Sequence, residues 1–503
     1  MLTRIAAFNS IAVFLDQLAI ILISLALTPT IISVMGVSAF GIWQLIVRGT
    51  SYVSLTDGRP HELLKWQIAR GDGVSDSTNK EHFGAGLIVW SSYLPFMMVC
   101  GAAFTFWMYL ISEGESASIQ VLVLATALMA FNAILISVRN FPEAILRGSN
   151  KGYKQIGSRM ICLLAAGILS IYAVKAGHGL LGLAVIQVLS TIALAIIFFI
   201  ITKKNVSWFG AKMPSLTQIK YAYRKGFWYF AWSILNFGFS SIDILLLGFF
   251  ASTTHVAKFA VTYYAIQMIT TTISNALGAV LPGIGSLIGR GESHRVQAVR
   301  NESILYSWWL AFSIAITILF VNGSFVRLWI DDDVFAGVFE NLLIVMMALQ
   351  MVFLRNDSLI INLALEQKEK VKVTLYSLIV IVVLSALLIP KYGIVGLCLS
   401  VMIGRLILNY FYPRIISSFF KSQQQGVSAI VRPLGWIIVV ILMALAVYAG
   451  NYIKIEGWFL LMLSAGVLFS LSLAITFLAG FDKSQKESLI NRLRSLKDKK
   501  QVE

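Results

Sequence analysis

The stretch that decides the fold reads LTPTIISVMGVSAFGIWQLIVRGTSYVSLTDGRPHELLKWQIAR over residues 27–70. Pro29 predicts a kink or an end in a first helix, and Gly36 predicts a turn after it. A second apolar helix opens at the Phe-Gly-Ile-Trp motif of residues 40–43 and carries Arg48 near its middle. A charge at the centre of a membrane helix costs about 2.5–3.5 kcal/mol, so such residues face a polar cavity or a partner. Arg48 therefore marks a candidate functional position.

The rest of the chain is as apolar as this stretch. Of its 503 residues, 58% are hydrophobic and 13% are charged, whereas soluble domains are about 25% charged. Apolar runs long enough to cross a bilayer recur from end to end. The sequence therefore predicts an all-α polytopic membrane protein. We expect about fourteen transmembrane helices, with approximate centres at Ala19, Leu45, Met98, Leu128, Gly167, Ile192, Phe237, Thr271, Ala315, Ala348, Val382, Ile403, Met443 and Val467.

The net charge of +16 is distributed unevenly along the chain. With the N-terminus inside, the predicted outer loops carry about one cation each, namely Lys175, Lys258, Arg327, Lys391 and Lys454. The predicted inner loops and the tail after Phe481 hold most of the remaining lysines and arginines. Cytoplasmic loops of membrane proteins are enriched in these residues. We therefore expect both termini in the cytoplasm, membrane lipids as partners, and no nucleic acid.

Motifs for enzymatic chemistry are missing from the sequence. Cys100, Cys162 and Cys398 lie in apolar runs without the spacing of metal ligands. The five histidines form no His-Glu-x-x-His group, and no Gly-rich phosphate loop occurs. We therefore predict a protein that is not an enzyme, with no metal and no cofactor. Coupling of transport to a Na⁺ or H⁺ gradient is a hypothesis that the sequence leaves open.

Three weak sequence matches at one offset indicate an internal repeat. Residues 39–43 resemble residues 258–262, Arg139-Asn140 matches Arg355-Asn356, and the Gly-rich run 179–183 matches 393–397. Each six-span unit keeps its orientation, as in parallel transporter repeats. We expect an N-terminal six-helix lobe (1–202), a basic cytoplasmic linker (203–225), a C-terminal six-helix lobe (226–413), appended helices 13 and 14 (414–480) and a basic cytoplasmic tail (481–503). The two lobes are expected to form a V around a central cavity.

Polar side chains follow one face of the predicted spans one, two, seven and eight, which are equivalent in the two repeats. Span seven is the clearest case, with polar positions that include Tyr229, Asn236 and Asp243; span eight carries Gln267, and span twelve carries Arg405. A shared polar cavity explains these stripes. Hydrogen bonding between packed helices is the competing explanation for the uncharged residues. For Arg48, a buried ion pair with Asp16 competes with a role in lining the cavity.

The chemistry of these positions favours an anionic ligand. Arginine binds phosphate through a planar fork with several donors, so a cavity lined by Arg48 and Arg405 suits an anionic head group. Asp16 and Asp243 are candidates for ion coupling, or for neutralising the arginines. A drug cation would instead require carboxylates and aromatic rings.

Three segments carry a resemblance to a known family. The Phe-Gly-Ile-Trp motif of residues 40–43, the Gly-Phe-Trp of residues 226–228 and the Asp-Ile-Leu-Leu-Leu-Gly of residues 243–248 resemble polysaccharide transporters of the O-antigen flippase type. The resemblance extends to about Pro413. The chain is also similar to the wider superfamily of multidrug, oligosaccharidyl-lipid and polysaccharide exporters. In this chain the segment 55–59 reads Leu-Thr-Asp-Gly-Arg, where relatives carry a Leu-Asp-Leu-Gly-like run.

The resemblance implies a flippase of the bacterial inner membrane that moves an undecaprenyl-diphosphate-linked oligosaccharide to the outer leaflet for O-antigen, capsule or exopolysaccharide synthesis. A polysaccharide polymerase and a chain-length regulator are its implied partners. The cationic cavity then maps onto Arg48 and Arg405, with Arg59, Arg139, Arg290 and Arg355 near the inner mouth. An ion-coupled multidrug or lipid II exporter of the same superfamily is the alternative. A membrane polysaccharide polymerase or ligase is a third hypothesis, which the short outer loops disfavour.

Overall fold

A computed structural model describes residues 20–69, 75–111, 119–149, 151–289, 291–363, 367–420 and 430–487. Every regular element in these ranges is a helix, so the predicted all-α membrane fold is confirmed. The chain divides into two compact units, Met1–Ala257 and Lys258–Glu503. Helix α8 therefore belongs to the first unit.

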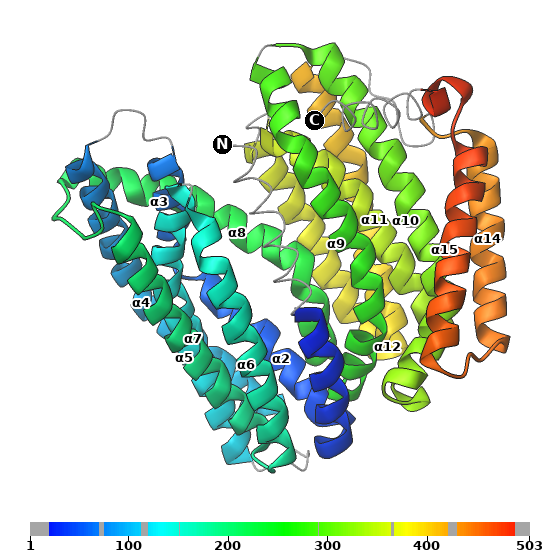
Figure 1. The fold of residues 1–503 in the computed structure, drawn as a ribbon, viewed down its shortest axis with the longest axis horizontal. Coiled ribbons are helices and arrows are strands. Elements are labelled where there is room, and N and C mark those ends of the chain that lie inside the picture. The colour runs from blue at the N-terminus through cyan, green and yellow to red at the C-terminus, as the bar shows by residue number, and fades with distance from the viewer. Residues whose placement is uncertain are drawn as a thin grey trace, which may run out of the picture. The chain divides into compact units, whose positions relative to one another are not determined.

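The first unit is built around α5. Its elements are the helix Ile20–Met35, α2 (Val37–Leu55), α3 (Pro60–Ala69), α4 (Asp76–Ile111), α5 (Ile119–Gly148), the short 3₁₀ turn η1 (Gly152–Gln155), α6 (Ile156–Lys175), α7 (Gly179–Asn205) and α8 (Leu216–Phe250). α5 packs against α7, α4, α3 and α2, and α8 packs against α2 and α4 (Figure 1). Because α5 contacts so many neighbours, its apolar side chains form much of the core of this unit.

The second unit is built around α10. It contains α9 (Thr253–Gly289, whose first turn lies in the first unit), α10 (Ser293–Trp329), η2 (Asp332–Val334), α11 (Val338–Leu363), α12 (Gln367–Phe420), α14 (Pro433–Tyr452) and α15 (Trp458–Gly480). In the most apolar part of α10, 72% of the residues are buried. α14 and α15 lie side by side against α10 (Figure 1). The Trp309 indole donates to the Leu473 carbonyl at 2.8 Å, which fixes α15 on α10.

The described helices account for the predicted spans from the second onward, and the centre of the first, Ala19, lies outside the described residues. Nine of them are long and apolar enough to cross a membrane, so the chain is a multi-pass membrane protein. One of the nine, α12, holds two predicted spans because the backbone leaves helical geometry at Gly393. α2, α8 and α9 are not among the nine. They correspond to the predicted spans two, seven and eight, and many side chains of α8 and α9 lie outside the described part.

The backbone at two glycines supports the internal repeat. Gly179 opens α7 and Gly393 opens the second half of α12, and both have φ of 54°. Only glycine adopts this left-handed conformation readily. The same turn therefore recurs at the offset of about 214 residues that the sequence match indicates.

The opening of α2 explains the glycine of the Phe-Gly-Ile-Trp motif. A Cβ added at Gly41 would lie 2.0 Å from the carbonyl oxygen of Thr253, and the hydroxyls of Ser38 and Thr253 are 2.8 Å apart. α2 therefore approaches the turn after α8 with no room for a side chain at this position. The turn at Gly36 is confirmed, with φ of 90°. The first helix does not end at Pro29, because the helix Ile20–Met35 continues through it.

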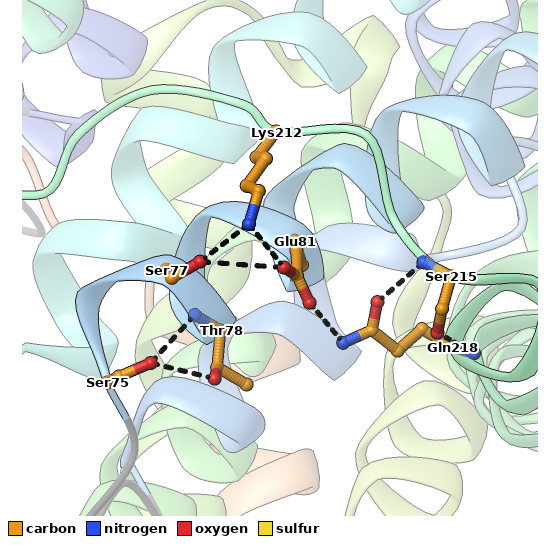
Figure 2. Close-up of polar contacts among 7 residues, drawn as sticks. All are labelled: Ser75, Ser77, Thr78, Glu81, Lys212, Ser215 and Gln218. Atoms are coloured by element: carbon orange, nitrogen blue, oxygen red, sulfur yellow. Dashed lines mark hydrogen bonds and ion pairs between the residues drawn. The ribbon is translucent and has the colours of Figure 1, made fainter.

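The connection from α7 to α8 is fixed to α4 by a polar network (Figure 2). Lys212 donates to the Ser77 hydroxyl at 2.9 Å and to the Glu81 carboxylate at 3.0 Å. The Gln218 amide donates to the other carboxylate oxygen of Glu81 at 2.8 Å and forms a capping box with Ser215 at the start of α8. This network sets where α8 begins, and α8 carries several of the candidate site residues.

The close approach at Gly41 leads to a stability prediction. Gly41→Ala should lower the free energy of unfolding by about 1–3 kcal/mol. This is the usual cost of overpacking when the added atoms force the backbone to move. Thermal unfolding of the purified protein in nanodiscs measures the effect. Gly157→Ala is the control, since an added Cβ there meets nothing within 4 Å. Equal melting temperatures of the two variants would contradict the packing argument.

Candidate functional site

The first unit brings together three of the predicted polar positions. Arg48 and Tyr52 lie one turn apart on α2, both half-buried, and Tyr52 interacts electrostatically with Arg48 and with Asp243 of α8. The two helices approach closely here, since a Cβ at Gly248 would lie 2.2 Å from the Leu45 side chain. The sequence places Asp243 on a different span from Arg48 and Tyr52, and the structure brings the three residues together in one cluster, which we name the α2–α8 cluster (Arg48, Tyr52, Asp243).

The α2–α8 cluster combines a cation, a phenol and a carboxylate. The Asp243 carboxylate accepts the backbone N–H of Ile244 at 3.0 Å, which orients it at its own helix. A guanidinium presents five donors in a rigid fork and suits phosphate or carboxylate. The arrangement can therefore bind an anionic group at Arg48, with Tyr52 adding a hydrogen-bonding hydroxyl. Within the described residues, no group of three or more His, Cys, Asp or Glu could hold a metal ion.

Arg59 lies in the short loop between α2 and α3 and has an unusual backbone. Its φ is 54°, the one positive value among the described non-glycine residues, and its N–H donates to the Asp57 carboxylate at 2.9 Å. Asp57 is 0% exposed and its second carboxylate oxygen lies 3.4 Å from Nδ1 of His61, which is 4% exposed. The departure from the family pattern at residues 55–59 therefore coincides with a buried acid and a buried histidine.

Arg139 lies on α5, two turns before that helix ends, and is half-buried. It interacts electrostatically with Glu143, Arg147 and Arg159. The Glu143 carboxylate in turn contacts Arg147 at 2.5 Å and Arg159 at 3.4 Å. Three arginines therefore share one carboxylate, which leaves this end of the first unit with excess positive charge.

The candidates of the second unit are spread over three helices. Arg405 on α12 is 6% exposed and donates through Nη1 to the Met347 carbonyl of α11 at 3.0 Å. This contact joins two packed helices, as the helix-packing explanation of polar residues requires. Arg355 on α11 and Gln267 on α9 are both exposed. The structure therefore gives Arg405 a structural contact and leaves Arg355 and Gln267 accessible.

Four sequence candidates have side chains that the structure does not describe. Asp16 and Arg290 lie outside the described residues. Tyr229 and Asn236 lie on the described backbone of α8, but their side chains are outside the described part. Their predicted roles stay predictions.

Sequence reasoning missed a buried ion pair in the second unit. Arg300 of α10 is 2% exposed and binds Asp357 of α11 with two hydrogen bonds of 2.7 and 2.9 Å. From the sequence, Arg300 counts as one of the inner-loop cations. Asp357 occurs in an apolar helix, and an acid at such a position signals a buried partner. That signal does not identify which cation is the partner.

Comparisons with known proteins place this geometry in context. The model of a family described as polysaccharide biosynthesis protein matches residues 80–288, which confirms the resemblance over this part of the chain. No protein of curated function matches the chain in sequence.

Solved structures of transporters share the fold. An inward-closed lipid II flippase, MurJ, is 13% identical with a TM-score of 0.70, over 94% of this chain and 99% of that one. An inward-facing multidrug resistance transporter of the MATE family is 15% identical with a TM-score of 0.59, over 81% and 96%. A transporter of the same MOP superfamily from Pyrococcus furiosus, with reversed polarity of its binding pocket, is 15% identical with a TM-score of 0.55, over 84% and 97%. At these identities the likeness establishes the fold.

The placements of the two arginines predict different losses of stability. Arg405→Ala should lower the free energy of unfolding by about 1.5–3 kcal/mol, because a hydrogen bond from a charged group to the buried Met347 carbonyl is lost. Arg48→Ala should lower it by less than about 1 kcal/mol, since Arg48 is half-buried in a polar cluster. Melting temperatures of both variants in nanodiscs make the comparison. Equal losses would show that Arg48, too, is held in a structural contact.

Proposed function

We propose that the chain is a flippase that moves an undecaprenyl-diphosphate-linked oligosaccharide from the inner to the outer leaflet of the bacterial inner membrane, for O-antigen, capsule or exopolysaccharide synthesis. The match to the polysaccharide biosynthesis family and the fold shared with a lipid II flippase support a transporter rather than an enzyme. The observation that carries the proposal is the half-buried Arg48 in the α2–α8 cluster, on a helix that otherwise suits a membrane.

Arg48 binds the diphosphate in this proposal. The diphosphate is the one charged part common to all such substrates, whatever sugars they carry. A planar guanidinium can engage two phosphate oxygens at once, and a site of low dielectric strengthens the pair. Tyr52 donates or accepts a hydrogen bond beside it. The polyprenyl tail stays in the bilayer, since moving it into a polar site would cost about 0.8 kcal/mol for each CH₂ group that leaves the apolar environment.

The remaining candidates take supporting roles in the same proposal. Arg59, Arg139, Arg290 and Arg355 attract the head group near the inner mouth, and Tyr229, Asn236 and Gln267 add further polar contacts. Arg405 joins α12 to α11 through the Met347 carbonyl. Asp16 and Asp243 are the candidates for binding a coupling Na⁺ or H⁺ as the protein alternates access between the two leaflets. Both termini lie in the cytoplasm, and a polymerase and a chain-length regulator act on the exported product.

A lipid II exporter is the second candidate. The observation that favours it is the extent of the match to the lipid II flippase, which covers nearly the whole of both chains. A multidrug exporter is the third candidate, since MATE structures also match. Lipid II and the oligosaccharide carrier share the polyprenyl diphosphate, so Arg48 serves both substrates. An organic cation would instead depend on Asp243 and would gain from the loss of Arg48.

Replacement of Arg48 tests the proposal in cells. Arg48→Ala should abolish export, so that lipid-linked repeat units accumulate on the inner leaflet and surface polysaccharide is lost. Arg48→Lys should keep part of the export, because the charge remains while the bidentate fork is lost. Surface polysaccharide is measured by gel or antibody, and the inner-leaflet intermediates by lipid extraction and mass spectrometry.

The matched control is Arg295→Ala. Arg295 is exposed and pairs with Glu292 at the start of α10, so its loss removes one positive charge that is not part of the α2–α8 cluster. This variant should export normally at the same protein level. Normal surface polysaccharide in Arg48→Ala, at an unchanged protein level, would contradict the assignment of Arg48.

A further inference from the structure

We propose that Asp57 and His61 form a proton-binding site whose occupancy is coupled to the conformation of the loop between α2 and α3. The coupling of this site to transport rests on the proposed function, whereas the proton site itself does not. Neither residue is among the predicted ion-coupling candidates, Asp16 and Asp243. The ligand is a proton, held between a carboxylate and an imidazole.

The geometry of the pair supports this proposal. The contact is between Oδ2 of Asp57 and Nδ1 of His61, at 3.4 Å, and both side chains are almost completely buried. In the described structure neither of these two atoms has a hydrogen-bond partner. A buried polar group without a partner costs about 1–3 kcal/mol. The contact joins an acid to a base, so binding of a proton to His61 changes the charge of this buried pair.

The groups around His61 define its electrostatic environment. The charges that act on it are Asp57 and Arg59 from the loop, and Glu62 and Lys65 from its own helix α3. Glu62 and Lys65 form an ion pair with each other, so their effects on His61 largely cancel. Asp57 favours the proton on His61, and the Arg59 guanidinium opposes it.

The helices packed against α3 enclose the pair. α5 presents the Phe141 ring edge-on to the His61 imidazole, with centroids 6.3 Å apart. From α4, the Tyr93 ring lies against Gly58, and from α8, Gly226 faces the Gly58 carbonyl. Burial by these neighbours lowers the pKa of His61 below its usual value. In the observed conformation of the loop, which we call the closed loop, His61 is therefore neutral at neutral pH. Conformations of the loop in which water reaches His61 bind a proton more tightly.

The backbone of the loop makes its conformation sensitive to protonation of the Asp57–His61 pair. Gly58 and Arg59 both have positive φ, of 74° and 54°, and the strained Arg59 is held by its N–H bond to the Asp57 carboxylate. A non-glycine residue in this region costs of order 1–3 kcal/mol and persists only when its surroundings hold it. The carboxylate that holds the strained residue is also the one that faces His61. Protonation therefore acts on the contact that keeps the loop closed, and the loop is directly connected to α2 and Arg48.

The direction of the pH effect follows from the lowered pKa. The stabilising contribution of neutral His61 is fully present above the pKa of about 6.5 of a hydrated histidine, and it is lost as pH falls below that value. The melting temperature of the wild-type protein in nanodiscs should therefore fall by about 2 °C per pH unit between pH 6.5 and 5.5. Amide exchange in residues 56–61, corrected for the intrinsic pH dependence, should accelerate over the same range.

Two substitutions and one control test the site without any substrate. His61→Gln should remove the pH dependence of exchange in residues 56–61, and Asp57→Asn should move it to lower pH, because the carboxylate that favours protonation is gone. His294→Gln is the control, since His294 is an exposed histidine at the start of α10. It should behave as the wild type does. Persistence of the wild-type pH profile in His61→Gln would overturn the proposal, and so would an equal loss of stability at every pH.

A second measurement tests the coupling to transport. In proteoliposomes that contain an undecaprenyl-diphosphate-linked oligosaccharide, an imposed pH gradient should change the flipping rate several-fold for the wild type and the His294→Gln variant. The rate for His61→Gln should not respond to the gradient. A gradient response of His61→Gln equal to that of the wild type would overturn the coupling. Absence of flipping in every variant would instead overturn the proposed function, and the exchange measurements would still decide the proton site.

Discussion

The main constraint on this structure is the presence of a charged side chain, Arg48, in the apolar helix α2. α8 lies close enough to α2 that Asp243 of α8 and Arg48 of α2 both act electrostatically on Tyr52. That proximity requires two glycines at helix contacts: Gly41 against the Thr253 backbone and Gly248 against the Leu45 side chain. An arginine that faces hydrocarbon costs several kcal/mol. The glycines of the two sequence motifs allow the close contacts of the helix that carries Arg48.

The two units treat their buried charges differently. In the second unit, Arg300 is satisfied by a bidentate contact with Asp357, and Arg405 by a backbone carbonyl of α11. Such contacts hold helices together and leave little capacity for a ligand. In the first unit, Arg48 is half-buried and Arg139 competes with Arg147 and Arg159 for one carboxylate. These two arginines of the first unit are the ones to which the proposed function assigns the anionic head group.

The sequence predicts the helices well and their contacts poorly. Each predicted span centre from Leu45 to Val467 lies in a described helix, because hydropathy reports directly on membrane insertion. The repeat was detectable because Gly179 and Gly393 serve the same turn. Helical periodicity shows which residues share a face, but it does not show which helix that face meets. For this reason the pairing of Arg300 with Asp357, and the burial of Asp57 with His61, could not be predicted. Of the two outcomes predicted at Pro29, the helix end is excluded because the helix Ile20–Met35 continues through it, and the kink stays a prediction.

The account's central claim is that the first unit carries an anion-binding site for a lipid-linked diphosphate. The most direct test is flipping by the purified protein in proteoliposomes that contain an undecaprenyl-diphosphate-linked oligosaccharide with a reporter on its sugar. The account predicts protein-dependent movement of the reporter between leaflets, inhibited by excess unlabelled polyprenyl diphosphate and unaffected by organic cations. Protein-dependent transport of organic cations, with no movement of the lipid-linked reporter, would contradict it.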